Sequence, residues 1–547
     1  MLSHAVFLII YYSKGRKNLL KYFFKYKYFL IAIAVIFIIA LATVTMSSSP
    51  LYVTNEWNDT NAMFTMGRSL VDGMVPFRDL VEQRGPVLYG IFAVASLISS
   101  TTFHGLFVIE LLNLIVVYYF TVLIIRIFLR DKNDESSAYL MAVIGPAVVV
   151  GTTAFEVGGS PEEFAFPIVL GFIYLALKWK NTKYHFKPWE FLFAGFGLFY
   201  LFWIKYSMLG ALVVFFVYIG IDMLIHMEWK KMGVVVAMSS LGFLVPSVLL
   251  IGLFYNHHAL HDLLHIYFGL NMDSYGTNTN GHIWQIWNYM KLAATPISMH
   301  WLISLITITA LATNRQGKSC FLVIFMFAGT IVMMVLSHYV RTYYVELLMP
   351  FFVLALIQFL TLTIENLPVS KVSILLSVLL GSAVIPFYAN TFLSTMTPKD
   401  SYKPFLDHGK PSASTLQEQF AESMIRKAHG TPTLLMINSL DAGFYLAAHT
   451  QPKTKYFHKL NVSYEQYPEM YNSFSESLNQ KKVQFVVVKV NNEKPSVINS
   501  AAAINAVYPV NRGPLSKNYH MIDYGFQKVL GSPTNWALFE VNSQEKK

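Results

Sequence analysis

The sequence predicts a polytopic α-helical membrane protein that carries a soluble α/β domain after its last membrane span. Of its 547 residues, 54% are hydrophobic and only 13% are charged, a balance that excludes an ordinary soluble protein. The apolar runs stop near residue 390, and the tail that follows contains no run long enough to span a membrane. These two observations separate a membrane part from a soluble part.

Apolar runs long enough to cross about 30 Å of hydrocarbon recur through the membrane part. They predict about eleven spans, several of them short. The predicted spans cover residues 29–46, 107–127, 138–151, 164–177, 191–204, 208–225, 234–253, 301–311, 321–336, 345–363 and 374–388. We expect the first span to be a retained anchor, because the basic segment before it is longer than that of a cleaved signal.

Basic residues mark alternate loops and so indicate the orientation of the spans, since Lys and Arg accumulate on the cytoplasmic side. The net charge of +10 is therefore a topology signal and does not predict nucleic-acid binding, because the basic residues flank apolar runs. The residues assigned to the cytoplasmic side are Lys14, Arg16, Lys17, Lys21, Lys25, Lys27, Arg126, Arg130, Lys132, Lys178, Lys180, Lys183, Lys187, Lys230, Lys231, Arg315 and Lys318.

This orientation predicts a multi-pass protein of the cell membrane with its amino terminus inside. An odd number of spans then places the long loop 47–102 and the whole tail on the extracytoplasmic face. We expect a membrane domain over residues 1–390 and an extracytoplasmic α/β domain over residues 391–547.

The tail shows both strand and helix signals. Strand-like blocks occur at 434–437, 483–488 and 537–541. Ser414 and Gln417 form a capping-box pattern before a helical repeat that Gly430 can close. A second helix is expected to begin at Ser439 and to carry Asp441 in its first turn.

The first outer loop contains the most informative acidic residues. Glu56 and Asp59 stand before a stretch in which Ala62, Met66 and Leu70 recur on one helical face, as in an interfacial helix. Asp59 fits two roles: a helix N-cap that accepts backbone N–H bonds, or a general base that takes the proton of an acceptor hydroxyl. The residues alone leave both roles open.

The order of motifs after Asp59 resembles bacterial GT-C glycosyltransferases of the protein mannosyltransferase and aminoarabinose transferase type. The resemblance runs through Gly73, Pro76-Phe77-Arg78-Asp79 and Gln83-Arg84-Gly85-Pro86-Val87-Leu88-Tyr89. Arg84 stands where these enzymes have Lys, which keeps the positive charge and changes the hydrogen-bond geometry. The resemblance continues in later segments, which are residues 158–167, Ile204-Lys205-Tyr206 and residues 338–344.

The resemblance implies a membrane enzyme that uses a polyprenyl-phosphate sugar, with Asp59 as its catalytic base. Arg84, Lys205 and Arg341 all fall at the predicted outer face, where cationic donors suit an anionic phosphate. For each of these three residues the alternative is contact with lipid headgroups or snorkelling. The residues assigned to acceptor binding or support are Glu56, Asp79, Glu162, Glu163 and Tyr344.

No metal site is predicted, although a divalent ion remains possible. Glu162 and Glu163 have several open roles: binding the acceptor, a metal ion or Lys205, or simple solvation. The spacing of His257, His261 and His265 suits metal ligands, but histidines at a wet interface are the simpler interpretation. The single cysteine, Cys320, excludes an intramolecular disulfide.

The sequence thus predicts an inverting glycosyltransferase that moves a monosaccharide from a polyprenyl-phosphate carrier to a hydroxyl of a cell-envelope acceptor. The acceptor is a glycopolymer, a lipid or a protein. The partners expected are this donor, this acceptor and the lipid bilayer, with no nucleic acid. The alternative is a polytopic transporter or flippase of lipid-linked envelope precursors, for which related halves with broken spans would be expected.

Overall fold

The computed structural model describes most of the chain. The described residues are 27–52, 55–129, 135–152, 154–155, 157–181, 185–272, 318–336, 341–366, 371–389, 414–428, 430–490, 498–529 and 532–542. The span expected at 301–311 lies outside them.

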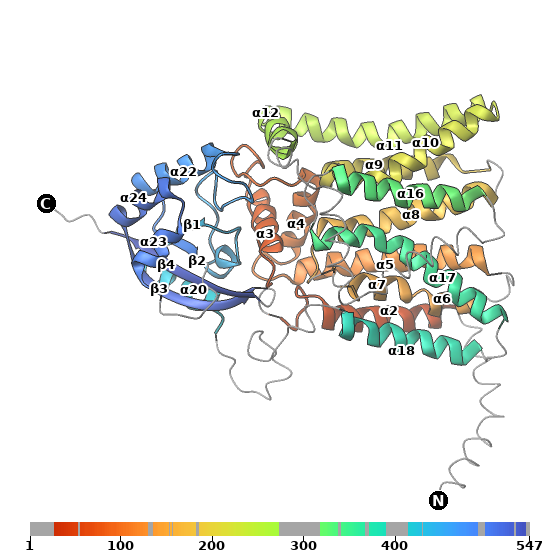
Figure 1. Cartoon of the computed structure of the whole chain (residues 1–547), viewed down its shortest axis with the longest axis horizontal. Helices are drawn as coiled ribbons and strands as arrows, with labels where there is room; N and C mark the ends of the chain where they lie inside the picture. Colours follow the sequence, from red (N-terminus) through yellow and green to blue (C-terminus); the bar gives the residue numbers. More distant parts are fainter. Residues whose placement is uncertain are drawn as a thin grey trace, which may run out of the picture.

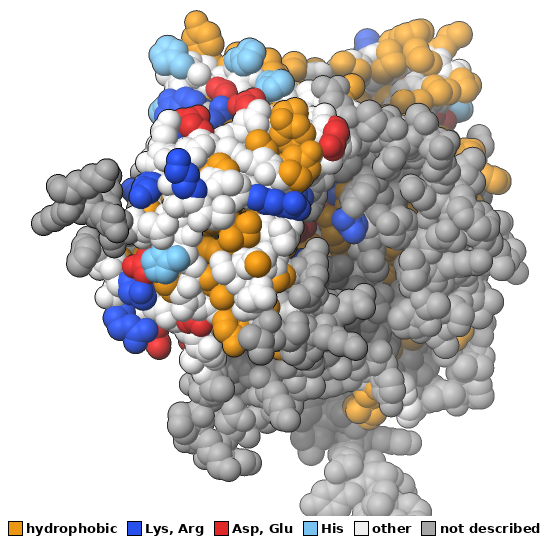
Figure 2. Space-filling view, turned by 60° about the vertical axis from the view of Figure 1, so that its left-hand side comes forward, with side chains coloured by type: hydrophobic (Ala, Val, Ile, Leu, Met, Phe, Trp, Pro, Cys, Tyr) orange, Lys and Arg blue, Asp and Glu red, His pale blue; other side chains and the backbone are white. Residues whose placement is uncertain are grey.

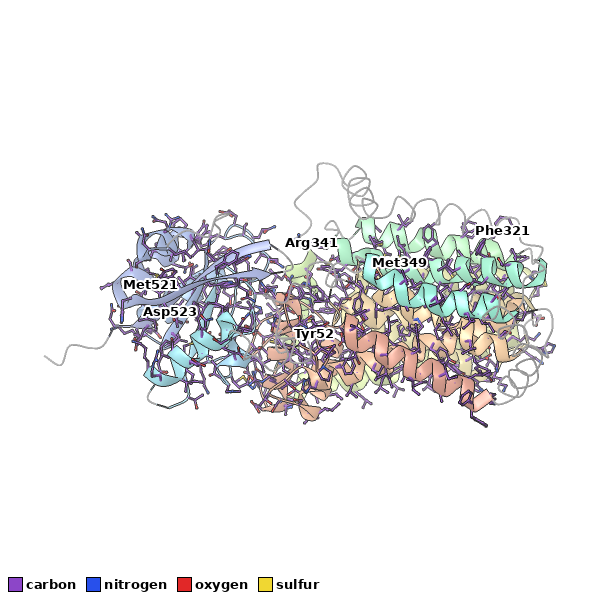
Figure 3. The ribbon with its side chains drawn as sticks, turned by 90° about the horizontal axis from the view of Figure 1, so that it is seen from below. Tyr52, Phe321, Arg341, Met349, Met521 and Asp523 are labelled. Carbon is purple, nitrogen blue, oxygen red and sulfur yellow. The ribbon has the colours of Figure 1, made fainter. Side chains whose placement is uncertain are left out.

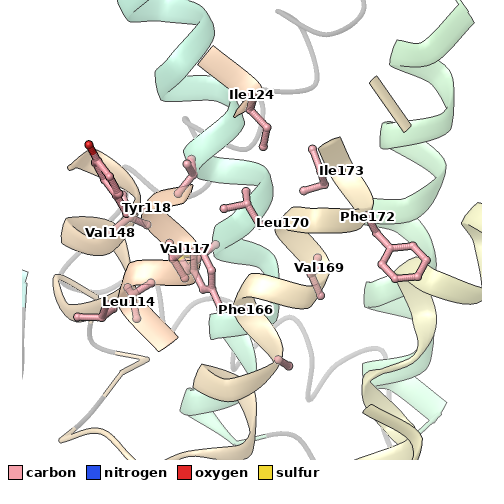
Figure 4. Packing of buried hydrophobic residues seen from close by; sticks show 14 of the residues in the cluster. Leu114, Val117, Tyr118, Ile124, Val148, Phe166, Val169, Leu170, Phe172 and Ile173 are labelled. Carbon is pink, nitrogen blue, oxygen red and sulfur yellow. The ribbon is translucent and has the colours of Figure 1, made fainter. Parts of the chain in front are cut away.

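A bundle of long helices forms one half of the molecule, and a small sheet with short helices forms the other (Figure 1). The bundle consists of α2 (Lys27–Thr45), α5 (His104–Phe128), α6 (Glu135–Met141), α7 (Ile144–Val150), α8 (Pro161–Asn181), α9 (Pro188–Lys205), α10 (Gly210–Ile225), α11 (Trp229–Asn256), α16 (Lys318–Leu336), α17 (Met349–Asn366) and α18 (Lys371–Ala389). Its interior is apolar: Leu114 and Val117 of α5 lie near Phe166 and Leu170 of α8 (Figure 4).

Within the described residues, five helices are long and apolar enough to cross a membrane. They are Lys27–Thr45, His104–Phe128, Pro188–Met208, Trp229–Asn256 and Tyr343–Thr363. Shorter apolar helices are Pro86–Ile98, Ser137–Val150, Gly210–Ile225, Phe321–Met334 and Leu375–Val384. A helical membrane protein is thus confirmed, but the count of about eleven spans is not.

The C-terminal part contains a four-stranded sheet in the order β1-β2-β4-β3. The strands are β1 (Leu434–Ile437), β2 (Phe485–Val490), β3 (Tyr519–Val529) and β4 (Ser532–Val541). β1 and β2 are parallel, as a crossover through α22 (Pro468–Asn479) requires, and the other pairs are antiparallel. The small α/β fold is as predicted; the sequence missed β3, whose apolar residues alternate with His, Asp, Gln and Lys.

Short helices and charged side chains surround this sheet. The helices are α20 (Leu416–Lys427), α21 (Phe444–Ala447), α23 (Ser500–Ala506) and α24 (Pro509–Asn518). Basic, acidic and histidine side chains are spread over the face of the C-terminal part in Figure 2, which is typical of a solvated domain.

Two local predictions in the tail are corrected. The N-cap of α20 is Thr415, whose hydroxyl accepts a bond from the backbone N–H of Glu418, so the capping box lies one residue later than expected. No helix begins at Ser439. Asp441 instead accepts a bond from the backbone N–H of Gly443, which has a φ of +90°, and α21 starts at Phe444.

A layer containing α3 (Asn58–Val71) and α4 (Pro86–Ile98) lies between the bundle and the sheet (Figure 1). Every residue of α3 from Asp59 to Ser69 is buried, so α3 is not an interfacial helix with one face in lipid. Its polar side chains contact the tail: Asn58 donates to Ser439 and Thr65 donates to Asp441. The segment α12 (Leu260–Leu263) and η3 (Leu264–Leu270) lies beside this layer and carries His261 and His265, whereas His257 follows the end of α11.

Candidate functional site

Asp59 lies at the start of α3 but is not its N-cap. The N-cap is Trp57, and no side chain caps this end of the helix. The carboxylate of Asp59 instead contacts the guanidinium of Arg84, with 2.5 Å between Oδ2 and Nη2. Both side chains are 11% exposed. Asp59 therefore does not cap α3, and its carboxylate forms a nearly buried ion pair with Arg84.

Arg84 is held by a second carboxylate, that of Glu82. Glu82 is fully buried and accepts bonds from Nη1 of Arg84 (2.5 Å), from the backbone N–H of Arg84 (2.9 Å) and from the hydroxyl of Tyr89 (2.5 Å). Burial disfavours the charged guanidinium, but Asp59 and Glu82 outweigh it and hold the pKa of Arg84 well above its usual value. Glu82 was not among the predicted site residues.

Gly85 brings Arg84 to the end of α9. Its backbone N–H donates to the carbonyl of Ile204 at 3.0 Å. A Cβ at this position would lie 1.9 Å from the carbonyl oxygen of Trp203, so only glycine permits this approach. Pro86 then occupies the first turn of α4, where a missing N–H costs little.

Lys205, the last residue of α9, faces the same region. Its Nζ lies 2.6 Å from Oε1 of Glu162, which is fully buried in the first turn of α8. The ammonium also lies over the ring of Tyr344, 3.4 Å from the centroid, and over that of Tyr343 at 5.6 Å. Of the open roles for Glu162, the structure favours pairing with Lys205.

A pocket of about 360 Å³ opens beside these groups. Its lining includes all three predicted phosphate-binding residues, Arg84, Lys205 and Arg341, together with Tyr344. Arg341 lies where the bundle meets the C-terminal sheet (Figure 3). The apolar part of the pocket lining includes Met272, Met333 and Leu336. The structure thus brings the predicted cations to one pocket that has both a charged and an apolar part.

Glu163 and Asp79 contact loop backbone away from this pocket's lining. Glu163 accepts a bond from the backbone N–H of Gly159 at 2.7 Å. Asp79 accepts from the N–H of Val75 at 2.7 Å and pairs with Arg78 at 2.8 Å. The bond from Arg78 is the main reason that the pKa of Asp79 lies below its usual value. Both carboxylates therefore fit structural roles better than substrate contact.

Glu56 is buried, 8% exposed, in the segment that leads into α3. It is next to Trp57, whose ring contacts that of Tyr343 at 5.3 Å between centroids. Glu56 is not part of the pocket lining.

The tail reaches this site through two residues that the sequence did not single out as site residues. Asn461 lines the pocket. His458 is fully buried, and burial is the main cause that lowers the pKa of its imidazole to about 3. The positive charge of Arg84 is the second cause. Asn461 begins an Asn-Val-Ser sequence that fits a glycosylation sequon and does not indicate a pocket, and His458 belongs to no motif.

No residue in the described part of the chain is assigned to metal binding. Across those residues, no group of three or more His, Cys, Asp or Glu side chains has an arrangement that could hold a metal ion. His261 and His265 stack on each other, with 6.0 Å between ring centroids.

Two solved structures share the overall fold of this chain. The crystal structure of ArnT from Cupriavidus metallidurans bound to undecaprenyl phosphate matches with a TM-score of 0.55 at 9% sequence identity, over 93% of this chain and 97% of that chain. The same protein in the apo state matches with a TM-score of 0.52 at 8% identity, over the same shares of the two chains.

A weaker similarity involves the arabinofuranosyltransferase AftD from Mycobacteria, with a TM-score of 0.49 at 9% identity over 94% of this chain and 42% of that chain. No protein-family model matches the sequence, and the comparison with curated proteins gives no match. The similarity to ArnT extends over nearly the whole of both chains, so this chain has a GT-C-like fold.

Proposed function

We propose that this protein is a membrane glycosyltransferase that moves a monosaccharide from a polyprenyl phosphate to a hydroxyl of a cell-envelope acceptor, with inversion at the sugar carbon. The observation that carries the proposal is the Asp59–Arg84 ion pair beside a pocket that also contains Lys205 and Arg341. A general base and cations for a leaving phosphate are the two things that this transfer needs.

The pocket suits both parts of the donor. Arg84, Lys205 and Arg341 offer hydrogen bonds to phosphate oxygens, and the side chains of Met333 and Leu336 offer apolar contact to the first isoprene units. ArnT, whose fold is similar, has been crystallised with undecaprenyl phosphate, which supports a lipid carrier of this class.

In the proposed reaction Asp59 accepts the proton of the acceptor hydroxyl as its oxygen attacks the sugar carbon. The bond from that carbon to the phosphate oxygen breaks, and the phosphate leaves with the electron pair. Arg84 contacts Asp59 and lines the donor pocket, so it places the base close to the phosphate. A single displacement of this kind inverts the configuration of the sugar carbon.

The proposed topology puts the site and the tail on the extracytoplasmic face, with residues 1–390 as the membrane domain and 391–547 as the outer domain. Lys205 and Glu162 mark the pocket end of α9 and α8. The basic loop between these two helices is therefore at the opposite end of the bundle, as the positive-inside rule requires for a cytoplasmic loop.

The test is a transfer assay with purified protein in lipid, using radiolabelled polyprenyl-phosphate sugars and cell-envelope extracts as acceptors. Release of free polyprenyl phosphate together with labelled acceptor is the expected result. Movement of intact lipid-linked sugar across a vesicle membrane, with no sugar transfer, would instead support the transporter or flippase.

A further inference from the structure

One stripe of polar side chains runs along α3, the helix whose first turn contains Asp59. The stripe consists of Asn58, Thr65, Ser69 and, at the C-cap, Asp72. At about 100° per residue, these four positions lie within about 60° of one another around the helix axis. Gly67 lies on the opposite side, where an added Cβ would be 2.4 Å from the carbonyl carbon of Phe92 in α4. One face of α3 therefore packs on α4, and the other is polar.

The tail covers this polar face from the first turn of α3 to its middle. Asn58 donates to the hydroxyl of Ser439 at 3.0 Å, and Thr65 donates to Oδ2 of Asp441 at 2.7 Å. Thr65 and Asp441 are both buried, so their bond lies out of water, where it is stronger than at the surface. The backbone N–H of Gly443 donates to Oδ1 of Asp441 at 2.9 Å and fixes this carboxylate within the tail.

A further contact lies at the last turn of α3. The side-chain oxygen of Gln451 accepts from the hydroxyl of Ser69 at 2.9 Å, and its amide nitrogen donates to Asp72 at 2.7 Å. Hydrogen bonds to the tail thus occur at the start, the middle and the end of the helix. They restrain both the rotation of α3 about its axis and its position along that axis.

Asp59 and Arg84 are held by different parts of the chain. Asp59 belongs to α3, whose polar face is bound by the tail. Arg84 precedes Gly85, whose N–H donates to the carbonyl of Ile204 in α9, so Arg84 is attached to the helical bundle. The ion pair between Asp59 and Arg84 joins the two parts. A shift of α3 would therefore move the carboxylate of Asp59 relative to Arg84 and to the pocket that Arg84 lines.

From this arrangement we propose that the tail positions the base, with Ser439 and Asp441 as positioning residues that set α3 so that Asp59 meets both Arg84 and the acceptor hydroxyl. This inference rests on the proposed function. It gives the tail a part in the chemical step without contact to the reacting atoms. Such positioning is a large part of catalysis, since a misplacement of about 1 Å can cost about 100-fold in rate.

The test uses full-length variants at the two bonds nearest Asp59. Thr65→Val keeps the shape of the side chain and removes the hydroxyl, whereas Thr65→Ser keeps the hydroxyl. Ser439→Ala removes the acceptor of Asn58 and leaves no buried carboxylate without a donor. This second variant decides the test if Thr65→Val does not fold.

Tyr519→Phe is the matched control for the loss of a hydrogen bond within the tail. Tyr519 is buried and donates to the carbonyl of Val483 at 2.9 Å, so both partners belong to the tail and neither lines the pocket. Three quantities are measured for each variant: kcat, the KM for acceptor, and the affinity for polyprenyl phosphate. Each variant is also combined with Asp59→Asn.

For Thr65→Val we expect kcat to fall by roughly 10- to 100-fold with unchanged affinity for polyprenyl phosphate. Ser439→Ala should lower kcat by roughly 5-fold, as for one neutral hydrogen bond. Thr65→Ser should recover most of the loss, and Tyr519→Phe should retain wild-type kcat. In the Asp59→Asn background neither Thr65→Val nor Ser439→Ala should cause a further loss, because the position of the base matters only while the base is present.

Several results would overturn the inference while leaving the proposed function intact. One is wild-type kcat in Ser439→Ala, together with either wild-type kcat or loss of folding in Thr65→Val. Another is a full further loss of kcat in the Asp59→Asn background, which would mean that these bonds act on the fold and not through Asp59. A wild-type protein that binds no polyprenyl phosphate and transfers no sugar overturns the proposed function, and this inference with it.

Discussion

Arg84 connects the two chemical tasks of the proposed site, because one guanidinium contacts the base and lines the donor pocket. Asp59 and Glu82 each lie 2.5 Å from it, so two carboxylates fix its orientation before any substrate binds. A lysine, with one nitrogen, could not meet Asp59, Glu82 and a phosphate through separate nitrogens. Arg84, in place of the Lys of the enzymes that the sequence resembles, therefore fits the proposed site, in which one residue contacts both the base and the leaving group.

Arg341 is expected to contribute directly to donor binding. Replacing it with Ala removes charge-assisted bonds to the phosphate and should weaken donor affinity by roughly 10-fold or more. Arg78→Ala is the control, since Arg78 pairs with Asp79 and is not in the pocket lining. Equal affinities of Arg341→Ala and Arg78→Ala for a polyprenyl phosphate, measured by titration, would place the phosphate elsewhere.

Lys205 is expected to matter for stability as well as for binding. Glu162 is fully buried, and Lys205→Met leaves its carboxylate without the ammonium, at a cost of about 3 kcal/mol in the free energy of unfolding. The double variant Glu162→Gln/Lys205→Met should recover much of this loss, because no buried charge remains. Apparent melting temperatures measure this, and a double variant as unstable as Lys205→Met would mean that the pair does not stabilise the fold.

Single site residues can be predicted from the sequence only where a motif or a position near a membrane span marks them. Asp59, Arg84 and Lys205 are predicted as site residues because they match motifs of the enzymes that the sequence resembles and fall at the predicted outer face. Glu82 and His458 were missed, since a buried acid beside an Arg and a histidine in a soluble tail look ordinary until the chain folds. Asp79 was assigned to the site from its motif, but its carboxylate is used by Arg78 and Val75.

At the scale of elements, α3 is the structural centre of the site. It packs against α4 on one side, where Gly67 lies close to the backbone of Phe92, and against the tail on the other. The sequence predicted the helix correctly from its apolar spacing. It could not show that the polar face is covered by the tail, because that contact joins residues almost 400 positions apart, such as Asn58 and Ser439 at a separation of 381.

The close contact of α4 with α9 gives an element-scale prediction. Gly85→Ala would push the start of α4 from the end of α9, because the new Cβ meets the carbonyl of Trp203 at 1.9 Å. We expect a loss of about 3 kcal/mol in stability and weaker donor binding, since overpacking separates Arg84 from Lys205. Gly90→Ala, in the same helix with nothing within 4 Å of the added Cβ, should be neutral or stabilising. Similar melting temperatures for the two variants would contradict this account.

At the scale of the whole molecule, the layered order of bundle, α3–α4 layer and sheet places the site at one end of the membrane part (Figure 1). Composition and charge predicted this division into a helical membrane part and an α/β tail. The number of spans could not be predicted in the same way. Some helices, such as α6 and α7, are only 7 residues long, and an apolar run in the sequence does not show where one helix ends and the next begins.

Orientation in the membrane can be measured by cysteine labelling in a Cys320→Ser background. Ser516→Cys, exposed in α24 of the tail, should react with an impermeant maleimide on intact cells. Lys230→Cys, exposed at the start of α11, should react only after permeabilisation. The reverse pattern would place the tail in the cytoplasm and the proposed donor on the wrong side.

The central claim, that Asp59 is the base of a sugar transfer, is tested most directly by the turnover of Asp59→Asn. Asn preserves size but accepts protons poorly, and Arg84 keeps Glu82 as a partner, so the fold should be retained. We expect kcat to fall by roughly 100-fold or more with donor affinity unchanged, and Asp79→Asn to retain wild-type turnover. Near-normal kcat in Asp59→Asn would contradict the account.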